Sequence, residues 1–550
     1  MTASSKPMEE NWHPSSLLSY DALPGHQDFY SIISDTKSTV DTRTDFYDRS
    51  LTSRRYALVG VACSSIFSCS CIVTGIVTLA NHGVLGVTVI NMAPVPFYHQ
   101  LRLQMEILAL VLNLIIALCT ESIGFVHGIS LRSALASECR LRFNTNLRLL
   151  TAARGWCNPN GALLNGISAV LLIISYSSAS LVVCFNSHFL NQFEDSEGFA
   201  IAGLPLLILG VALLLQVMIA LSGMRAVKVL TWSSSPFDLT AALVHHTQLT
   251  PATFRCMRCV SDLDTNGGPA RPSETQPSAW HAHPSIRKVV ISLWGIVAAC
   301  AGWAVLVMYI RDKYFGPSSI PPNALNTQTW SFIPNSQNGQ VNFIEYGMTS
   351  VGIQWWILLL VNMAVVQGPL TLGLHCSELI ANVIRDERQW RCATGRKGLR
   401  IATNPVKTIF THPICLVLFV AKPFLHWMFG LSFIISEVAY DGQLEGSSVL
   451  MAIAQVRTYQ IWNLCIALFI FACFFTFVAL RRPRGPQPAA YGHVQTLANL
   501  VDEWSPVMWW GHKDDGIPYC HAGTSDHLLP DVKMDCVYAG SGVESLAPVS

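Results

Sequence analysis

The chain has 550 residues, of which 51% are hydrophobic and only 13% are charged, and its net charge is +1. Soluble domains carry about 25% charged residues, so this composition argues against an ordinary soluble protein and indicates an integral membrane protein. The near-zero net charge gives no electrostatic reason to expect a nucleic-acid partner.

Residues 1–55 form a polar segment rich in Ser, Asp and Thr. The segment has no basic-then-apolar signal pattern, so we do not expect a cleaved secretory leader. Its low hydrophobicity predicts a disordered N-terminal arm in the cytosol.

Eight apolar runs follow, each long enough for the roughly 20 helical residues that cross a bilayer. Because lipid offers no partner to backbone N–H and C=O groups, each run should be α-helical. A soluble bundle is disfavoured, because the runs lack the amphipathic period of soluble surface helices. The sequence predicts an all-α integral membrane protein whose spans are Tyr56–Ala80, Leu103–His127, Gly161–Phe185, Ala200–Met224, Val289–Ile310, Val351–Gly373, Pro413–Glu437 and Tyr459–Leu480.

The two halves of the chain resemble each other. In each half the second run continues into a Cys- and Arg-containing segment, and the fourth is followed by an apolar patch, "PFDLTAALV" or "HVQTLANLV". Four spans per half predict a parallel 4+4 repeat, in which an axis along the membrane normal relates the two halves. The alternative is a chance resemblance between apolar helices. The expected domains are membrane repeats at 56–224 and 289–480, a cytosolic linker at 225–288, an outer loop at 311–350 that could fold as a cap, and a cytosolic tail at 481–550.

Basic residues indicate the orientation. With the N-terminus in the cytosol, 30 of the 35 Lys and Arg residues fall on the cytosolic side. This asymmetry predicts that both termini are cytosolic. None of the 17 cysteines falls clearly in an outer loop, so we expect reduced thiols and no disulfides. Span length does not decide between the plasma membrane and an endomembrane.

The second run carries a polar stripe. Glu106, Asn113, Thr120 and His127 recur every seven residues, which places them within a sector of about 60° on a helix. Glu121 lies beside them and deeper than the ends of the run. A carboxylate facing lipid is costly, so the stripe should face the bundle interior. It could line a hydrated path or substrate site, or it could supply ordinary interhelical hydrogen bonds.

The seventh run contains a cation near its centre, in "VAKPFLHWMF". Lys422 and His426 are one turn apart on the same face, and Pro423 between them predicts a kink. An intramembrane lysine is a candidate functional residue that needs a partner. We expect that partner to be Glu121, with Glu437 or a freed carbonyl as alternatives, and a purely structural ion pair stays open.

A Cys pair and a His pair lie in the linker. Cys256 and Cys259 form "CMRC", and His281 and His283 form "HAH". Two thiolates and two imidazoles can bind zinc, but the His spacing is shorter than in known sites and a single CxxC is weak evidence. The intervening "SDLDTNGGPARPSETQPSAW" favours a flexible linker instead.

The tail gathers metal-type ligands in "WWGHKDDGIPYCHAGTS". His512, Cys520, His521 and Cys536 are irregularly spaced for zinc, and no nucleophile–base pair suggests catalysis. The nearby "WSPVMWW" has three Trp in seven residues, which suits anchors at a membrane interface. We expect an extended, turn-rich segment beneath the cytosolic face.

The same tail resembles that of a group of uncharacterised multipass fungal membrane proteins. The resemblance covers about thirty residues and the general layout of spans, and an insertion, "DDGIPYC", separates its two main motifs here. It implies a fold and a fungal origin, and no activity. The matching residues are Trp510-Gly511-His512-Lys513, His521-Ala522-Gly523-Thr524-Ser525, Leu529-Pro530 and Tyr538-Ala539.

Two classes of function fit these features. Glu121 and Lys422 could line the path of a transporter- or channel-like protein for a small molecule or ion. Alternatively, the chain could be a non-transporting scaffold, assembly factor or sensor that acts through its arm, linker and tail. Nucleotide-binding and common hydrolase motifs do not occur in the sequence, which argues against an ABC-type pump and the common hydrolases. Their absence does not exclude an intramembrane enzyme, which ranks third. We predict no catalytic residue and no cofactor, and the lipid bilayer is the one expected partner.

Overall fold

The computed structural model describes residues 51–82, 87–91, 98–190, 194–262, 268–315, 330–332, 343–348, 353–401, 412–441 and 448–539. Residues 1–50 of the predicted N-terminal arm lie outside the described residues. Its last five residues, Leu51–Arg55, are helical, so the first helix begins earlier than the apolar run.

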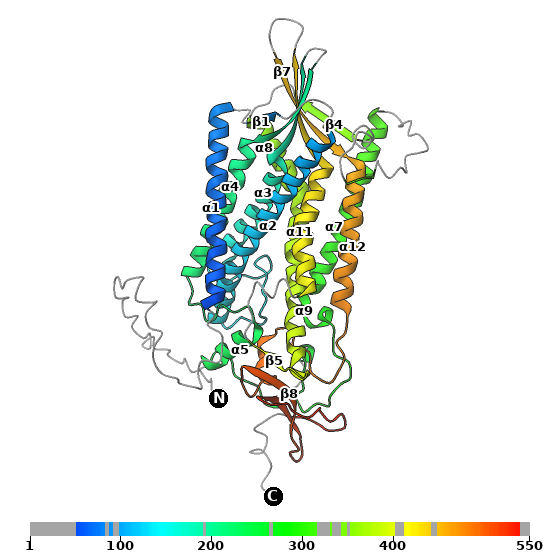
Figure 1. The fold of residues 1–550 in the computed structure, drawn as a ribbon. Coiled ribbons are helices and arrows are strands. Elements are labelled where there is room, and N and C mark those ends of the chain that lie inside the picture. Colours follow the sequence, from blue (N-terminus) through cyan, green and yellow to red (C-terminus); the bar gives the residue numbers. More distant parts are fainter. Residues whose placement is uncertain are drawn as a thin grey trace, which may run out of the picture. The chain divides into compact units, whose positions relative to one another are not determined.

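Eight helices within the described residues are long and apolar enough to cross a membrane, which confirms the eight predicted spans and a multi-pass membrane protein. The sixth continues past its apolar run, as α8 followed directly by α9 (Figure 1). The spanning helices are α1 Leu51–His82, α2 Tyr98–Ser137, α3 Ala162–Val182, α4 Gly203–Arg225, α7 Pro284–Phe315, α8 Ile353–Cys376 with α9 Glu378–Arg391, α11 Pro413–Ser432 and α12 Thr458–Leu480.

Helices α1 and α4 approach closely because glycine lies at their contact. A β-carbon added to Gly75 of α1 would lie 2.8 Å from the backbone nitrogen of Leu207, and one added to Gly210 of α4 would lie 2.7 Å from the carbonyl oxygen of Ser68. Small residues permit such packing where lipid provides no hydrophobic drive between helices. Since α3 packs on α4 and α2 lies beside α1 and α4, the first half is a four-helix bundle.

The second half packs in a similar way and contacts the first mainly through two helix pairs. Helix α7 lies along α12, α11 lies beside α12, and α8 contacts α7. Helix α11 also packs on α2, and α8 packs on α3. The interface between the halves is therefore formed by α2 and α3 from one half and α8 and α11 from the other.

A six-stranded sheet at one end of the bundle corrects the prediction of an all-α fold (Figure 1). We call this end the sheet end. The third and seventh runs were expected to stay helical to Phe185 and Glu437, but both helices end earlier and the chain continues as strands. The backbone N–H and C=O groups of these strands form hydrogen bonds with neighbouring strands. At the centre of the sheet, β2 and β6 pair in parallel. In sheet order the strands are β1 Val87–Asn91, β3 Glu194–Ala202, β2 Val183–Leu190, β6 Phe433–Asp441, β7 Ser448–Arg457 and β4 Phe343–Met348.

The outer loop predicted at 311–350 is described only in part. Residues Arg311–Phe315 prolong α7, and 343–348 form β4. Between them, the carbonyl oxygens of Trp330 and Ser331 accept hydrogen bonds from Asn463 and Gln460 of α12, at 3.0 Å and 2.9 Å. The rest of the predicted cap lies outside the described residues.

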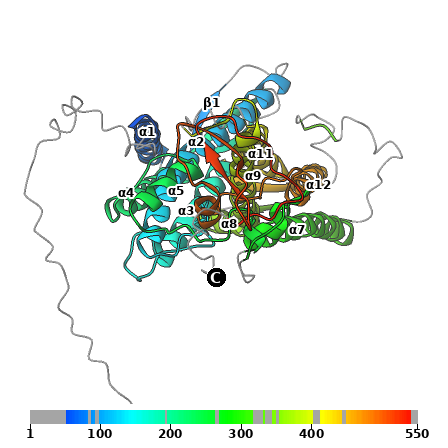
Figure 2. The same ribbon diagram turned by 90° about the horizontal axis from the view of Figure 1, so that it is seen from below.

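The opposite end, which we call the tail end, carries a folded layer rather than an extended cover (Figure 2). A three-stranded sheet, β5-β8-β9, lies there, with the short helix α13 in contact with β9 and with α5, and the short helix α6 in contact with α9. Its tryptophans do not all serve as membrane anchors, because Trp510 is 3% exposed and contacts Trp390 of α9 with ring centroids 6.3 Å apart. The elements are α5 Pro236–His245, α6 Ala279–Ala282, β5 Leu399–Arg400, α13 Val494–Leu500, β8 Val507–Asp514 and β9 His521–Ser525.

The linker belongs to the same layer. Ala270 and Tyr538 exchange backbone hydrogen bonds of 3.0 Å and 2.9 Å, and the Tyr491 hydroxyl donates to the Pro277 carbonyl at 2.9 Å. Residues 268–280 therefore make defined contacts with the tail, where the sequence favoured a flexible linker.

Candidate functional site

Lys422 of α11 forms ion pairs with two carboxylates, Glu121 of α2 and Glu378 of α9. The pairing with Glu121 predicted from the sequence is thus present, and it joins the two halves of the bundle. The lysine side chain is 1% exposed, whereas those of Glu121 and Glu378 are 33% and 29% exposed. Burying an unpaired ammonium would be costly, so two partners explain how this one is accommodated.

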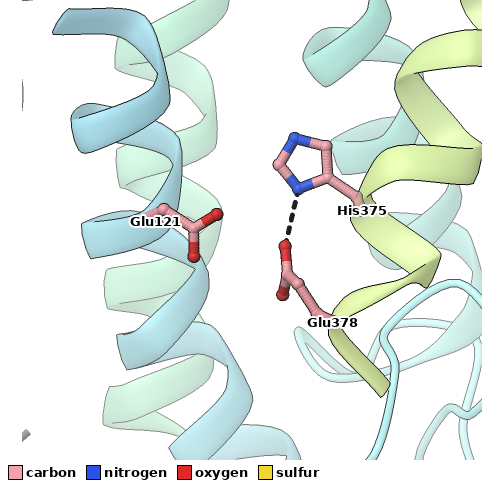
Figure 3. A group of neighbouring side chains, drawn as sticks. All are labelled: Glu121, His375 and Glu378. Atoms are coloured by element: carbon pink, nitrogen blue, oxygen red, sulfur yellow. Dashed lines mark hydrogen bonds and ion pairs between the residues drawn. The ribbon is translucent and has the colours of Figure 1, made fainter. Parts of the chain in front are cut away.

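One continuous helical segment, α8 followed by α9, positions the second carboxylate. Helix α8 ends at Cys376 and α9 begins at Glu378, but Ser377 between them is itself helical, and its N–H donates to the Gly373 carbonyl at 3.0 Å. The Ser377 hydroxyl also donates to that carbonyl, at 2.8 Å. His375, in the last turn of α8, hydrogen-bonds through Nδ1 with Glu378 Oε1 at 2.9 Å, and Figure 3 shows both facing Glu121 across the interface.

The sequence did not single out Glu378 or His375. The sixth apolar run was predicted to end at Gly373, which left both residues in a cytosolic segment. The His-x-x-Glu spacing was the available signal, because residues three apart on a helix lie on one face.

A cavity of about 420 Å³ opens beside this ion-pair cluster. It is lined by α1, α2, α9, α11 and the loop at 144–148, and Glu121, Glu378 and Lys422 lie in its wall. Its volume is within the range of small-molecule sites, about 300–1,000 Å³. About a third of each glutamate side chain is exposed, and both side chains line this cavity. The two carboxylates are therefore accessible to a ligand.

Glycine on α2 widens the cavity. Gly124 and Gly128 both lie in its wall, and a β-carbon added to Gly128 would meet nothing within 4 Å. One added to Gly124 would lie 3.2 Å from a guanidinium nitrogen of Arg148, which also lines the cavity. The missing side chains at these positions therefore contribute directly to the open volume.

A fully buried polar layer lies on the sheet-end side of the ion pairs. Tyr176 of α3 stacks on His426 of α11 with ring centroids 3.8 Å apart, and its hydroxyl is 3.3 Å from the Thr120 hydroxyl. The Gln367 amide of α8 is 3.0 Å from His426 Nδ1. We call Thr120, Tyr176, Gln367 and His426 the buried layer. None of the four lines the cavity, so the cavity stops beneath them.

The remaining stripe residues face the bundle interior, as their spacing predicts. Asn113 and His127 are buried. The Asn113 amide donates to the Ala109 carbonyl at 2.9 Å, and Glu106 accepts a 3.0 Å hydrogen bond from the Trp427 indole. These contacts are structural, because Glu106, Asn113 and His127 do not line the cavity.

One group among the described residues has metal-compatible geometry, namely Glu121, His375 and Glu378, whose ligand atoms lie within 4.8 Å of one another. The Lys422 ammonium already pairs with both carboxylates and lies 3.5 Å from His375 Nδ1. A divalent ion would have to displace this cation, so the geometry favours an ion-pair cluster over a metal centre.

The linker zinc candidates are placed in separate surroundings. Cys256 packs into the apolar core of the tail-end layer, and the Cys259 thiol donates to Asp262 at 2.9 Å. Burial raises the pKa of both thiols to about 11, which disfavours the thiolates that zinc requires. His281 and His283 join neither cysteine in a metal-compatible group within the described part of the chain.

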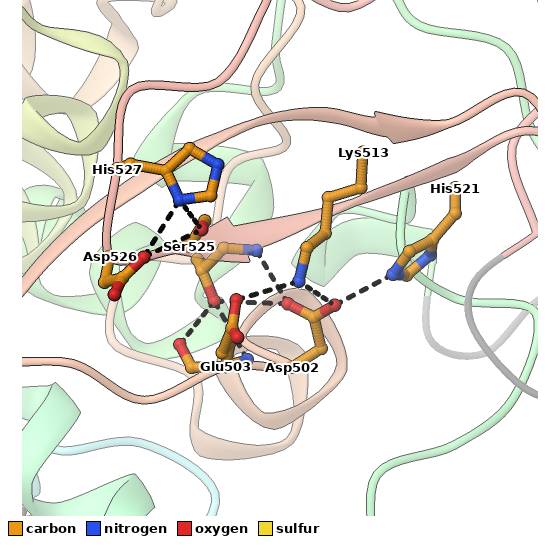
Figure 4. A network of polar contacts seen from close by, with 8 residues as sticks. Asp502, Glu503, Lys513, His521, Ser525, Asp526 and His527 are labelled. Carbon is orange, nitrogen blue, oxygen red and sulfur yellow. Dashed lines mark hydrogen bonds and ion pairs between the residues drawn. The ribbon is translucent and has the colours of Figure 1, made fainter.

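The tail motif residues form a network around Asp502 (Figure 4). This carboxylate accepts hydrogen bonds from His521 Nε2 at 2.8 Å, the Thr524 backbone N–H at 2.7 Å and Lys513 Nζ at 3.1 Å. Burial alone would raise the pKa of Asp502, but these donors lower it to about 2. The network fastens the β8–β9 hairpin to the end of α13.

Two tail glycines permit close contacts. A β-carbon on Gly523 would collide with the Asp502 carboxylate, and one on Gly511 would collide with the Pro530 carbonyl oxygen. The "WGHK", "HAGTS" and "LP" residues are therefore explained by the folding of this hairpin.

The metal-type residues of the tail serve that fold. His512 Nδ1 is 2.9 Å from the Tyr538 hydroxyl, and His521 belongs to the network around Asp502. With Cys520 and Cys536 they form no metal-compatible group among the described residues. No protein-family model, no curated protein and no solved structure matches this chain, so the roles assigned to its residues follow from their geometry and chemistry.

Proposed function

We propose that this chain is a transporter-like membrane protein that admits a small molecule or ion from the tail end to Glu121, Glu378 and Lys422. The observation that carries the proposal is the cavity of about 420 Å³ with this cluster in its wall. An ionisable group within a membrane span is a functional candidate by default. Here three such groups are paired with each other, and the two carboxylates among them are about a third exposed beside the cavity.

The arrangement of helices supports alternating access. The cluster lies where α2 and α11 bring the two halves together, and the buried layer closes the space toward the sheet end. A cationic group that binds Glu121 or Glu378 shares the carboxylate with Lys422, which weakens the ion pairs that hold the halves in this state.

A 4+4 parallel repeat is part of the proposal. In the sheet order β1-β3-β2-β6-β7-β4, each half supplies three strands in matching sequence, and the central β2 and β6 are parallel. A two-fold axis along the strands would relate the halves in this way. The helices α5 and α13, which follow the fourth span of each half, support the same relation.

We also propose that the tail end faces the cytosol, with both termini on that side. The excess of Lys and Arg in segments at the tail end supports this orientation. In that case the cavity opens toward the cytosol.

A scaffold, assembly factor or sensor is the second candidate. The observation that favours it is the close pairing of Lys422 with both carboxylates beneath a fully buried layer, which a purely structural core would also have. In that case the folded tail-end layer would carry the interaction with a partner.

Uptake by reconstituted protein separates the two functions. Full-length protein in liposomes is incubated with a small-molecule cell extract, and the contents of the liposomes are identified by mass spectrometry. We expect at least one compound to accumulate with the wild type and to lose accumulation with Glu121→Gln. Glu106→Gln is the matched control, because it makes the same change on α2 outside the cavity.

If no compound accumulates although the protein is folded and correctly inserted, the transporter proposal is wrong. Equal losses with Glu121→Gln and Glu106→Gln would also contradict it, because the effect would then not depend on the cavity.

A further inference from the structure

Helix α9 presents three different polar groups to the cavity in a row. Glu378, Asn382 and Arg385 all line it, and their spacing of four and three residues places them on one face. From Glu378 to Arg385 the helix rises about 10 Å. The cavity wall therefore has a carboxylate at its deep end and a guanidinium nearer its mouth.

The deep end offers unused acceptors. Lys422 bonds Oε1 of Glu121 and Oε1 of Glu378, and His375 also contacts Oε1 of Glu378. Oε2 of each carboxylate has no hydrogen-bond partner among the described residues, and both side chains are about a third exposed. Arg148 lies close by and, together with Lys422, balances the charge of the two carboxylates, but its Nη1 is directed to His127 at 3.3 Å. Two free oxygens facing one cavity suit a ligand's ammonium group.

The mouth offers unused donors. Arg385 binds Asp386 Oδ1 through Nε and Nη2, at 3.3 Å and 3.0 Å, while its Nη1 and the Asn382 amide have no partner in the described part of the chain. Asp386 is buried behind the wall and does not line the cavity. The neighbouring Arg132 offers less to a bound molecule, because Asn144 and backbone carbonyls already accept from its Nη1 and Nη2, and only its buried Nε lacks a partner. The free donors suit an acidic group.

The wall between the two ends is largely apolar. Phe125 and Leu418 line it beside the glycines of α2. A polar molecule body would leave its own groups unpaired there, whereas a hydrocarbon body is well accommodated.

We infer that the cavity binds a zwitterion with an apolar body, whose ammonium group lies against Glu121 and Glu378 and whose carboxylate or phosphate lies against Asn382 and Arg385. This ligand class deepens the proposed function, since it becomes the transported class only if the chain transports. Both polar ends of the ligand replace water with charge-assisted hydrogen bonds, and neither end requires a metal.

Binding of a synthetic probe tests this assignment without requiring transport. The probe is 8-aminooctanoate, measured by calorimetry with full-length purified protein. Two matched probes each lack one charge, namely its methyl ester, which is only cationic, and its N-acetyl derivative, which is only anionic. We expect the zwitterion to bind about tenfold or more tightly than either one, because each lost charge removes a charge-assisted contact.

Variants assign the two ends. Arg385→Gln should reduce the affinity for 8-aminooctanoate to that for the methyl ester, and should leave the affinity for the methyl ester unchanged. Glu121→Gln should reduce the affinity for the methyl ester and leave the affinity for the N-acetyl derivative unchanged. Arg388→Gln is the control, because this arginine is exposed on the same helix and does not line the cavity.

No binding of 8-aminooctanoate, or equal binding of all three probes, would overturn the inference. Binding without uptake by liposomes would uphold the ligand class while contradicting transport. Uptake restricted to compounds with a single charge or none would uphold transport while contradicting the ligand class.

Discussion

The imidazole of His426 lies flat on the phenol ring of Tyr176, with centroids 3.8 Å apart and 12° between the ring planes. His426 is one helical turn from Lys422, so the same face of α11 supplies both the cavity wall and the layer that closes it. The stack joins α3 of one half to α11 of the other. Any motion that opens the cavity toward the sheet end must therefore separate these two rings.

Removing the phenol ring should open a leak. In Tyr176→Ala the stack is lost, and we expect proton leakage across proteoliposomes to rise above the wild-type rate, measured with a pH-sensitive dye inside the vesicles. Tyr176→Phe keeps the ring and loses only the contact with Thr120. Its vesicles should leak no faster than the wild type, and its free energy of unfolding should fall by about 1 kcal/mol. Gln367→Ala, a smaller truncation in the same layer, should also leak. If both alanine variants leak protons no faster than the wild type, this layer is not the barrier that closes the cavity.

Removing the buried ammonium should destabilise the protein through the carboxylates that it leaves behind. Breaking a fully buried pair on one side costs about 3–5 kcal/mol. Here the carboxylates left behind are about a third exposed to the cavity, so the loss should be smaller, and Lys422→Met should still lower the melting temperature. Adding Glu121→Gln and Glu378→Gln removes both orphaned charges and should restore most of the loss. If the triple variant melts below Lys422→Met, the charges are not the cause.

The eight spans and the Lys422–Glu121 pair could be predicted from sequence because each has a local physical cause. A bilayer demands length and apolarity, and an ammonium near the centre of an apolar run demands a carboxylate at similar depth. Glu378 and the cavity could not be predicted in this way. The cavity depends on how α1, α9 and α11 pack around Gly124 and Gly128, and that packing leaves no signal in any one segment.

The sheet and the tail were missed for a related reason. Hydropathy continues without interruption from α3 into Val183–Phe185 and from α11 into Phe433–Ile435, so only pairing with strands distant in sequence distinguishes strand from helix. Likewise, Trp510 has the composition of a membrane anchor, but its buried contact is Trp390, far away in the chain.

The tail hairpin should lose stability at low pH through Asp502. Its pKa is lowered to about 2 in the folded protein, against about 3.9 in an unfolded chain. The stabilisation is therefore complete above pH about 4 and disappears as the pH falls toward 2. Asp502→Asn should expose the amides of β8 and β9 to faster hydrogen exchange at pH 7, at a cost of about 1–3 kcal/mol. It should also flatten the pH dependence below 4, whereas the exposed Asp531→Asn should match the wild type.

Filling the cavity should separate ligand binding from stability. Gly128 lines the cavity, and a β-carbon there meets nothing within 4 Å. Gly128→Ala should therefore be tolerated, with a gain of up to about 1 kcal/mol because alanine favours the helix over glycine. Gly128→Leu places a larger side chain in the open volume and should reduce both probe binding and uptake while the protein stays folded.

The control for this effect is Gly295→Leu on α7, where an added β-carbon also meets nothing within 4 Å but lies outside the cavity. It makes the same change in composition and helix propensity, so its binding and uptake should match the wild type. Melting temperatures of all three variants check that they fold. Unchanged binding in a folded Gly128→Leu variant would mean that the ligand does not occupy this space, whereas a selective loss would place it beside α2, within reach of Glu121.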